Sequence, residues 1–314
     1  MEIHEISALA KKITDNIGRV IVGRVSTLEL LTAALIAGGH VLLDDVPGTG
    51  KTVMAKSLAK SVDCAFARIQ FTPDLLPSDV TGMSVFNQKA SEFEFKPGPV
   101  FTNILLADEI NRATPRTQSA LLECMEERQV TADGVTRALD APFFVIATEN
   151  PVEQAGTYNL PEAQLDRFLM RLNPGYPDSA ESMVILDRFI RNSPLEELGS
   201  VASAAEVLDA QRSFSDVRVS EPVRKYIVAV CEGTRKLDQA ALGVSPRGML
   251  SLMRASQALA AVRGRDYVLP DDVKELCRPV LAHRIVLRSS FGAAAKTAEL
   301  LENMLRAIPV PTED

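Results

Sequence analysis

The chain has 314 residues, 46% of them hydrophobic, and a formal net charge of −7 at pH 7, which together predict a globular protein of two domains with substantial cores. No apolar run reaches the ~18 residues of a membrane-spanning helix, and residues 1–10 lack the basic start and apolar core of a signal peptide, so we expect a cytoplasmic protein. The acidic balance argues against a nucleic-acid partner, because phosphate contacts require a basic surface.

The cysteines and histidines are too dispersed to predict a disulfide framework or a metal site. None of the cysteines stands in a C-x-x-C pair, and we interpret each as a small core residue. We assign none of the histidines to a metal. The residues in question are Cys64, Cys124, Cys231 and Cys277, together with His4, His40 and His283.

Two helices are predicted at the start of the chain. Apolar residues at helical spacing indicate one helix over residues 4–18 and another over 26–37. Between them, Ile21, Val22 and Gly23 break the pattern. Apolar backbone just upstream of a phosphate loop is well placed to hold a nucleobase, so Val22 and Gly23 are candidate adenine-pocket residues. A plain turn between two helices explains the same residues equally well.

The stretch from His40 to Lys56, HVLLDDVPGTGKTVMAK, carries the clearest chemical signal. A short apolar strand at 41–43 leads into a loop rich in Gly and Pro, and a helical pattern begins at Lys51. Phosphate binding requires this order, because backbone N–H groups surround the anion while a helix N-terminus faces it. Lys51 can reach the β- and γ-phosphates, and the Thr52 hydroxyl can bind Mg²⁺. The sequence therefore predicts a nucleoside triphosphate site.

The predicted phosphate loop consists of Val46, Pro47, Gly48, Thr49, Gly50, Lys51 and Thr52. The consensus G-x-x-x-x-G-K-[ST] has Gly at the position of Asp45, and Asp44 precedes it here. Two carboxylates beside a triphosphate would repel it unless both side chains point away.

The segment after this helix is predicted to hold a strand, a loop and a hairpin. The strand covers residues 66–70. Two closely spaced prolines indicate that 71–79 is a structured loop with no regular element. Partial alternation of apolar and polar residues over 86–101 predicts a hairpin that protrudes between core elements.

An acid pair ends the next predicted strand. Residues 104–107 are a buried apolar run, and Asp108 and Glu109 follow it directly. The strand ends of a parallel sheet meet at one edge, where ligands bind. Phosphoryl transfer to water needs one group in the Mg²⁺ shell and another that polarises the water. We assign Asp108 to the metal and Glu109 to the water; a solvated strand end is the alternative for the pair taken alone.

A helix and a second hairpin follow the acid pair. Thr114 and Pro115 are typical of a helix start, with a capping hydroxyl followed by proline in the first turn. The Asp133-Gly134 dipeptide predicts the tip of a hairpin over 128–141.

Two more strands complete the first domain. A buried strand over 143–147 leads to Asn150, and another strand is predicted over 168–172. We expect the Asn150 side chain at the same sheet edge as the acid pair, where it could orient a water or contact a γ-phosphate. An Asn that caps the turn before Pro151 is an equally good interpretation.

From residue 177 onward the pattern is helical. A capping box at Ser203 and Glu206 opens one of the later helices. We divide the chain into domains 1–176 and 177–314, because strand signals stop near residue 176. Helices are predicted over 177–191, after Ser203, behind Pro222, over 247–262 and over 270–282, with a loose tail from Pro309.

Seven segments together resemble the MoxR branch of the AAA+ ATPases. They are HVLLDDVPGTGKT at 40–52, RIQFTPDLLPSD at 68–79, LLADEINRA at 105–113, ALLECMEERQVT at 120–131, FFVIATENP at 143–151, GTYNLPEAQLDRF at 156–168 and SPRG at 245–248. The resemblance implies an α/β fold: an AAA+ P-loop NTPase core, with a parallel sheet flanked by helices, followed by a small all-helical lid domain. It also implies that the hairpins at 86–101 and 128–141 are the family's helix-2 and pre-sensor-1 inserts.

The resemblance further implies a role for each matching residue. Lys51 and Thr52 resemble the Walker A pair, and Asp108 and Glu109 resemble the Walker B pair. Asn150 resembles the sensor-1 residue.

Two arginines are included in the resemblance. Arg167 resembles the finger that reaches a neighbouring subunit's nucleotide, and Arg247 resembles the sensor-2 arginine, expected in the same site as Lys51. A guanidinium suits either role, because it places fixed positive charge where the transferring phosphoryl group is most negative. Glu149 stands where the branch often has an amide.

The leading functional hypothesis is an ATPase that binds Mg²⁺ and ATP, assembles into a ring, expected to be a hexamer, and remodels or matures a protein partner like a chaperone. The resemblance implies a partner with a von Willebrand factor A domain. A P-loop kinase for a small molecule explains the phosphate loop equally well, but not an acid pair and an Asn poised for water. A nucleic-acid motor is the third hypothesis, and the acidic total argues against it.

Overall fold

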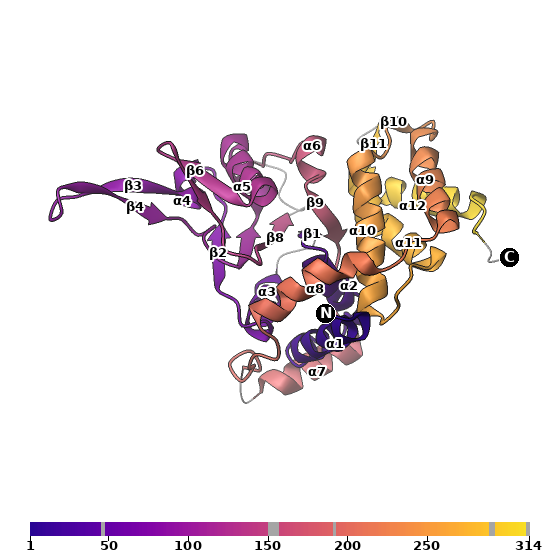
Figure 1. Cartoon of the computed structure of the whole chain (residues 1–314), viewed down its shortest axis with the longest axis horizontal. Helices are drawn as coiled ribbons and strands as arrows, with labels where there is room; N and C mark the ends of the chain where they lie inside the picture. The colour runs from indigo at the N-terminus through magenta and orange to yellow at the C-terminus, as the bar shows by residue number, and fades with distance from the viewer. Residues whose placement is uncertain (45–47, 150–156, 191–192, 289–292, 312–314) are drawn as a thin grey trace.

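A five-stranded parallel sheet forms the centre of the computed structural model, which describes residues 1–44, 48–149, 157–190, 193–288 and 293–311 (Figure 1). The strand order is β2-β5-β8-β1-β9. Neighbouring strands run parallel throughout, so all of them end at the same edge. The strands are β1 (His40–Asp44), β2 (Phe66–Gln70), β5 (Ile104–Asp108), β8 (Phe144–Glu149) and β9 (Phe168–Leu172). All five predicted strands are confirmed.

Helices cover both faces of this sheet, which explains why its strands are apolar runs. Val41 and Leu43 point into a cluster shared with α1, α2 and α3, whereas Leu42 points into a cluster shared with α5. The alternation along β1 therefore separates two cores. The helices are α1 (Ile3–Gly18), α2 (Val25–Ile36), α3 (Lys51–Ser61) and α5 (Pro115–Glu127). Thr114 precedes α5 as predicted, but its hydroxyl makes no capping hydrogen bond.

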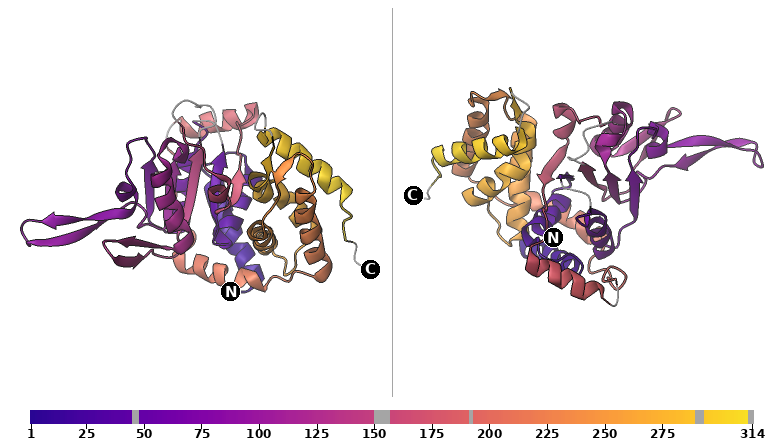
Figure 2. Two further views of the ribbon diagram at one scale, coloured as in Figure 1. Left: turned by 90° about the horizontal axis from the view of Figure 1, so that it is seen from above. Right: turned by 180° about the vertical axis from the view of Figure 1, so that it is seen from behind.

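Two hairpins extend from the core, and the first differs from its prediction. It is formed by β3 (Gly82–Asn87) and β4 (Glu92–Pro97), not by 86–101, and it projects from the sheet on the side opposite α12 (Figure 2). Gly82 begins β3 with a φ of 92°, and a Cβ at this position would meet the Lys96 carbonyl oxygen at 2.4 Å, so only glycine fits here. The second hairpin, β6 (Gln129–Ala132) and β7 (Val135–Ala138), confirms the prediction over 128–141.

One short helix contradicts the loop predicted over 71–79. Helix α4 (Pro77–Thr81) starts inside that segment with proline in its first turn. Proline is tolerated there because the first N–H groups of a helix have no partner within the helix. The Asp79 carboxylate also accepts a hydrogen bond of 2.8 Å from the Leu76 N–H.

The second half of the chain is mainly helical. The Ser203 hydroxyl caps α8 and Glu206 completes the capping box, as predicted. Strands do not end near residue 176 as the sequence predicted. A small antiparallel pair, β10 (Ala240–Leu242) and β11 (Val286–Leu287), lies among the helices. The helices are α6 (Glu162–Leu165), α7 (Ser179–Phe189), α8 (Ala204–Ser213), α9 (Glu221–Arg235), α10 (Pro246–Val262), α11 (Pro270–Leu276) and α12 (Ala293–Ala307).

The predicted helix over 270–282 is three successive pieces. After α11 the chain makes a π-helical turn, Cys277–Leu281, and then a 3₁₀ turn, Ala282–Arg284. Pro279 lies within the π-helical turn, and proline lacks the N–H that regular helical bonding would use. Two further 3₁₀ turns occur at Ile110–Arg112 and Phe214–Asp216.

Helices from the two halves of the chain pack directly on one another. Helix α10 contacts both α1 and α2, and their buried residues belong to one hydrophobic cluster. The domain boundary near residue 176 stays a prediction. Among the described residues, no helix combines the length and apolar character that crossing a bilayer would require.

Candidate functional site

The predicted phosphate loop joins the end of β1 to the start of α3. Gly48 and Gly50 have φ angles of 83° and 88°, in the left-handed region that side chains disfavour. This backbone turns directly into α3, which begins at Lys51 with Gly50 as its N-cap. The first N–H groups of a helix lack carbonyl partners and carry partial positive charge, so they favour an anion. Of the predicted loop residues, Val46 and Pro47 lie outside the described part of the chain, as does Asp45.

The acid pair lies at the end of β5, where hydrogen bonds hold both carboxylates. Asp108 is 9% exposed; its Oδ1 accepts a bond of 2.7 Å from the Thr148 hydroxyl, and its Oδ2 pairs with Arg68 Nη2 at 2.7 Å. Glu109 Oε2 accepts bonds from Gln70 Nε2 at 2.8 Å and Arg112 Nη1 at 3.1 Å. Donors from β2, β8 and the turn after β5 thus fix where the two acids lie.

The backbone also turns sharply between these two acids. Glu109 has φ 55° and ψ 50°, a left-handed conformation that is uncommon for a side chain of this size. Its N–H donates to the Thr148 hydroxyl at 2.8 Å. A single buried hydroxyl therefore bonds to both acids. It contacts the side chain of Asp108, the candidate metal ligand, and the backbone of Glu109, the residue assigned to the water.

A third group of charges lies where β1, β8 and β9 end. Asp44 and Glu149 are partners in the parallel register, and Arg171 Nη2 pairs with Asp44 at 2.9 Å and with Glu149 at 3.4 Å. Burial raises the pKa of Glu149; Arg171 opposes that shift and Asp44 adds to it. Arg171 therefore offsets the negative charge that Asp44 brings close to the phosphate loop. Asn150, the predicted sensor, follows Glu149 but lies outside the described residues.

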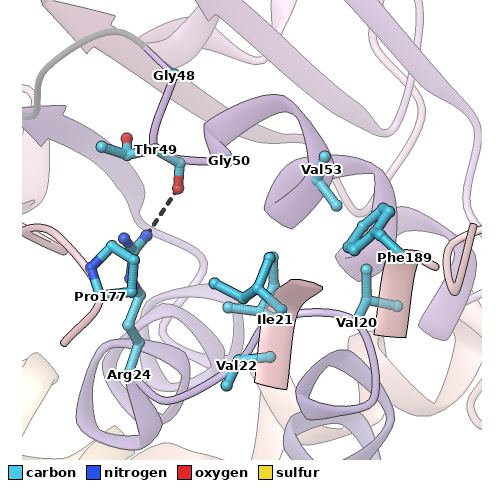
Figure 3. A pocket seen from close by; sticks show the side chains of 11 residues that line it. Val20, Ile21, Val22, Arg24, Gly48, Thr49, Gly50, Val53, Pro177 and Phe189 are labelled. Atoms are coloured by element: carbon cyan, nitrogen blue, oxygen red, sulfur yellow. Dashed lines mark hydrogen bonds between the residues drawn. The ribbon is translucent and has the colours of Figure 1, made fainter. Parts of the chain in front are cut away.

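An apolar pocket of about 190 Å³ opens beside the phosphate loop (Figure 3). Val22 lines it, as predicted for an adenine-pocket residue, whereas Gly23 does not. Gly23 instead packs against α7, so closely that a Cβ at this position would lie 1.9 Å from the Glu181 carboxylate. The lining residues are Val20, Ile21, Val22, Arg24, Gly48, Thr49, Gly50, Val53, Pro177, Ile185 and Phe189.

Hydrogen bonds hold the far wall of this pocket in place. Arg188 of α7 donates to the carbonyl oxygens of Gly18 and Arg19 at 2.9 and 2.7 Å. Arg24 donates to the Thr49 carbonyl at 2.9 Å and to the Gly175 carbonyl at 2.6 Å. The turn after α1, the phosphate loop and α7 therefore form one pocket, with polar loop backbone on one side and aliphatic side chains on the other.

Arg167 and Arg247 lie elsewhere, at the edge of the sheet where the strands begin. Both line a hollow of about 220 Å³ that also includes His40, the first residue of β1. Since β1 has five residues, the two sheet edges are separated by about 13 Å. Arg167 Nη1 donates to the Leu122 carbonyl at 2.6 Å, and Arg247 pairs with Glu126. The expectation that Arg247 shares one site with Lys51 within a chain is therefore wrong, because the start of α10 packs at the opposite edge.

Magnesium is the metal that the donor set fits. Among the described residues no group of three or more His, Cys, Asp or Glu side chains could hold a metal by itself. Magnesium is commonly bound by one or two protein oxygens that are completed by phosphate oxygens and water. Thr52 at the start of α3 and Asp108 at the end of β5 are oxygen donors of this kind, on the edge that carries the phosphate loop.

Several residues of the site were not predicted from the sequence. Thr148 is the last residue but one of the buried strand β8, and its place near the strand end could have drawn attention to it. Arg68 and Gln70 are polar residues at alternate positions of β2, so both point to one face of the sheet. Gln70 is the register partner of Asp108 on β5, which places the two residues on the same face as Asp108. Arg24 and Phe189 had no local signal, because their place at the pocket depends on contacts between segments that are far apart in the sequence.

Two family models and several relatives match this chain. Residues 40–170 match the family "ATPase family associated with various cellular activities (AAA)", and residues 232–304 match the family "AAA lid domain". YeaC of Bacillus subtilis is 49% identical over 98% of this chain and 97% of its own length. Chaperone MoxR1 of Mycobacterium tuberculosis is 41% identical, covering 98% of this chain and 83% of its own.

A solved structure is similar over almost the whole chain. It is a candidate ATPase from Cytophaga hutchinsonii, 40% identical, with a TM-score of 0.90 over 98% of this chain and 96% of that one. Protein MoxR of Paracoccus denitrificans is 34% identical over 93% of each chain. The chain, an AAA+ core with a helical lid, therefore belongs to the MoxR family of AAA+ ATPases, enzymes that hydrolyse ATP.

Proposed function

We propose that ATP binds with its phosphates on the loop from Val46 to Thr52 and its adenine in the pocket beside Val22. The observation that carries this proposal is the meeting of β1, β5 and β8 at one sheet edge. There the first turn of α3, the Asp108–Glu109 pair and an apolar pocket are neighbours. Thr52 and Asp108 would hold Mg²⁺, which when bound would neutralise charge on the phosphate oxygens.

Glu109 is proposed as the residue that polarises the attacking water. Its carboxylate is held by Gln70 and Arg112, and its backbone by Thr148, so three hydrogen bonds position this residue. Asn150 is proposed to orient the same water. Hydrolysis then needs added positive charge at the γ-phosphate, as arginine fingers supply in related phosphoryl transfers.

We infer that this charge comes from a neighbouring copy of the chain. Arg167 and Arg247 lie at the sheet edge opposite the phosphate loop, where both line the hollow beside His40. A closed ring, such as a hexamer, would present the arginines of each subunit to the nucleotide of the next. This arrangement replaces the cis role first expected for Arg247.

The work done by hydrolysis is proposed to be the remodelling or maturation of a protein partner. A relative is named a chaperone, and the resemblance to the MoxR branch implies a partner with a von Willebrand factor A domain. We place this activity in the cytoplasm.

Two single-site variants test the shared site. Arg167→Ala should bind ATP as the wild type does but hydrolyse it about 10³-fold or more slowly, as for loss of an arginine finger. Glu109→Gln should also bind ATP without hydrolysing it, yet keep its own Arg167. Mixing the two variants should restore part of the activity, because intact nucleotide sites then receive intact arginines. A mixture as inactive as its components would refute the shared site.

A further inference from the structure

Asp166 connects the sheet to the lid at the position directly before Arg167. Its Oδ1 accepts a hydrogen bond of 2.6 Å from Arg284 Nε, and its Oδ2 accepts one of 3.4 Å from the Ser245 hydroxyl. Its backbone carbonyl accepts a further bond of 3.1 Å from Arg284 Nη2. One residue between α6 and β9 is thus bonded to two separate segments of the lid.

The contact with Ser245 leads to the second arginine. Ser245 is the N-cap of α10, and its hydroxyl accepts a hydrogen bond of 3.2 Å from the Gly248 N–H. Arg247 lies within this first turn of α10. The same hydroxyl therefore joins the Asp166 carboxylate to the turn that carries Arg247.

The contact with Arg284 anchors this carboxylate. Arg284 is 6% exposed and donates to the carbonyl oxygens of Phe168 at 2.7 Å and Leu169 at 3.3 Å, both in β9. Burial lowers the pKa of Arg284 while Asp166 acts to raise it. A buried guanidinium that loses its carboxylate is left uncompensated, which disrupts structure strongly. The pair therefore locks the lid segment around Arg284 to the start of β9.

The two arginines also share one neighbour, helix α5. Arg167 bonds to the carbonyl of Leu122 and Arg247 to the side chain of Glu126. Residues four apart lie on the same face of a helix, roughly 5–6 Å from each other. The two guanidinium groups are therefore presented side by side, one from the core and one from the lid.

We propose that Asp166 is a positioning residue that fixes Arg167 and Arg247 relative to each other, so that a neighbouring subunit's nucleotide receives both together. This inference rests on the proposed function, because it assigns the two arginines to a site in another copy. Asp166 itself contacts neither nucleotide nor water. Its effect passes through the backbone before Arg167 and through the first turn of α10.

The lid offers a matched control for ordinary loss of stability. Asp272 is 1% exposed and pairs with Arg265 at 2.6 Å and with Arg263 at 3.4 Å. Its partners among the described residues are Arg265, Arg263 and the Leu269 N–H, which lie outside α5 and do not include Arg167 or Arg247. Asp272→Asn therefore breaks a buried carboxylate–guanidinium pair in the same lid without touching the pair of arginines.

The experiment compares Asp166→Asn with Asp272→Asn, each alone and mixed with Glu109→Gln. Asp166→Asn should keep the wild-type dissociation constant for ATP and lose about tenfold to a hundredfold in kcat, because small misplacements of reacting groups have effects of this size. Mixing with Glu109→Gln should restore its activity to the level of the Arg167→Ala mixture. Asp272→Asn should unfold at lower urea yet keep its kcat, and mixing should only dilute its activity.

Ser245→Gly is the second variant, for the case in which Asp166→Asn does not fold. Glycine is nearly as good an N-cap as serine, so α10 keeps its start while the link to Asp166 is lost. A smaller loss of kcat, restored by mixing, is expected. Two results would overturn this inference while leaving the shared site intact. One is a wild-type kcat in both Asp166→Asn and Ser245→Gly. The other is a loss of kcat that mixing with Glu109→Gln does not restore, although mixing restores the activity of Arg167→Ala. Failure of the Arg167→Ala mixture as well would remove the shared site on which it rests.

Discussion

Replacing Thr148 by valine is the sharpest test of how the sheet edge that carries Asp108 and Glu109 is built. Thr148 is fully buried, with 0% exposure, and its hydroxyl donates to Asp108 while accepting from the Glu109 N–H. Valine has almost the same shape but no hydroxyl. The substitution therefore leaves the packing in place and removes both hydrogen bonds.

The expected loss of stability follows from those two bonds. A hydrogen bond to a charged group contributes about 1.5–3 kcal/mol, and a buried donor left without a partner costs about 1–3 kcal/mol. Arg68 still pairs with Asp108 in the variant, so the lower part of each range applies. We expect Thr148→Val to lower the free energy of unfolding by about 2–4 kcal/mol and to reduce ATP hydrolysis, because Glu109 loses the bond that holds its left-handed backbone.

Thr148→Ser is the matched control. It keeps the hydroxyl and loses one buried methyl group, a change of about 1 kcal/mol, and should retain hydrolysis. Urea denaturation gives the free energies, and phosphate release at saturating ATP gives the rates. The reasoning would be refuted if valine were no more destabilising than serine, or if the valine variant hydrolysed ATP at the wild-type rate.

Two further changes test the pocket and the charges around it. Phe189→Ala should weaken binding of ATP and of ADP by about five- to tenfold, because the loss of apolar contact is worth about 1–1.5 kcal/mol. The control Leu186→Ala, on the same helix but 62% exposed and outside the pocket lining, should bind both nucleotides as the wild type does. Equal effects of the two substitutions, measured by titration calorimetry, would contradict the assignment of the pocket. Burial raises the pKa of Glu149 above its ordinary 4.5, so the folded chain keeps a proton that the unfolded chain has released, and the free energy of unfolding falls as pH rises through that window. Glu149→Gln should abolish this fall. As pH rises above 4.5, the free energy of unfolding of the variant should therefore increase relative to that of the wild type, until the difference becomes constant. A difference that does not change with pH would contradict the raised pKa of Glu149.

Local sequence signals were sufficient for the elements that carry the proposed phosphate loop and the acid pair. The apolar runs before Asp44 and Asp108 are strands because both faces of the sheet are covered, so no polar residue interrupts them. The Gly-rich composition of the loop before Lys51, followed by a helix start, predicts a phosphate-binding loop. These features depend on neighbours in sequence, and they were predicted with nearly correct bounds.

The features that failed depend on contacts between distant segments. The first hairpin begins at Gly82 and not at residue 86, and there Gly82 lies against the backbone of Lys96 and Gly98, a contact that no local pattern reveals. Arg247 was expected beside Lys51, but α10 packs against α1 and α2 and brings its first turn to Glu126. A helix start specifies its cap and not the direction in which the helix leaves the core. The placement of a lid on a core is therefore a tertiary property that the motif around Arg247 does not encode.

The most direct test of the central claim is the rate of ATP hydrolysis across mixtures of Arg167→Ala and Glu109→Gln at constant total protein. If an arginine of one copy completes the nucleotide site of the next, the rate is near zero for either variant alone and highest at an intermediate ratio. A rate that stays near zero at every ratio, while both variants bind ATP and assemble as the wild type does, would contradict the account.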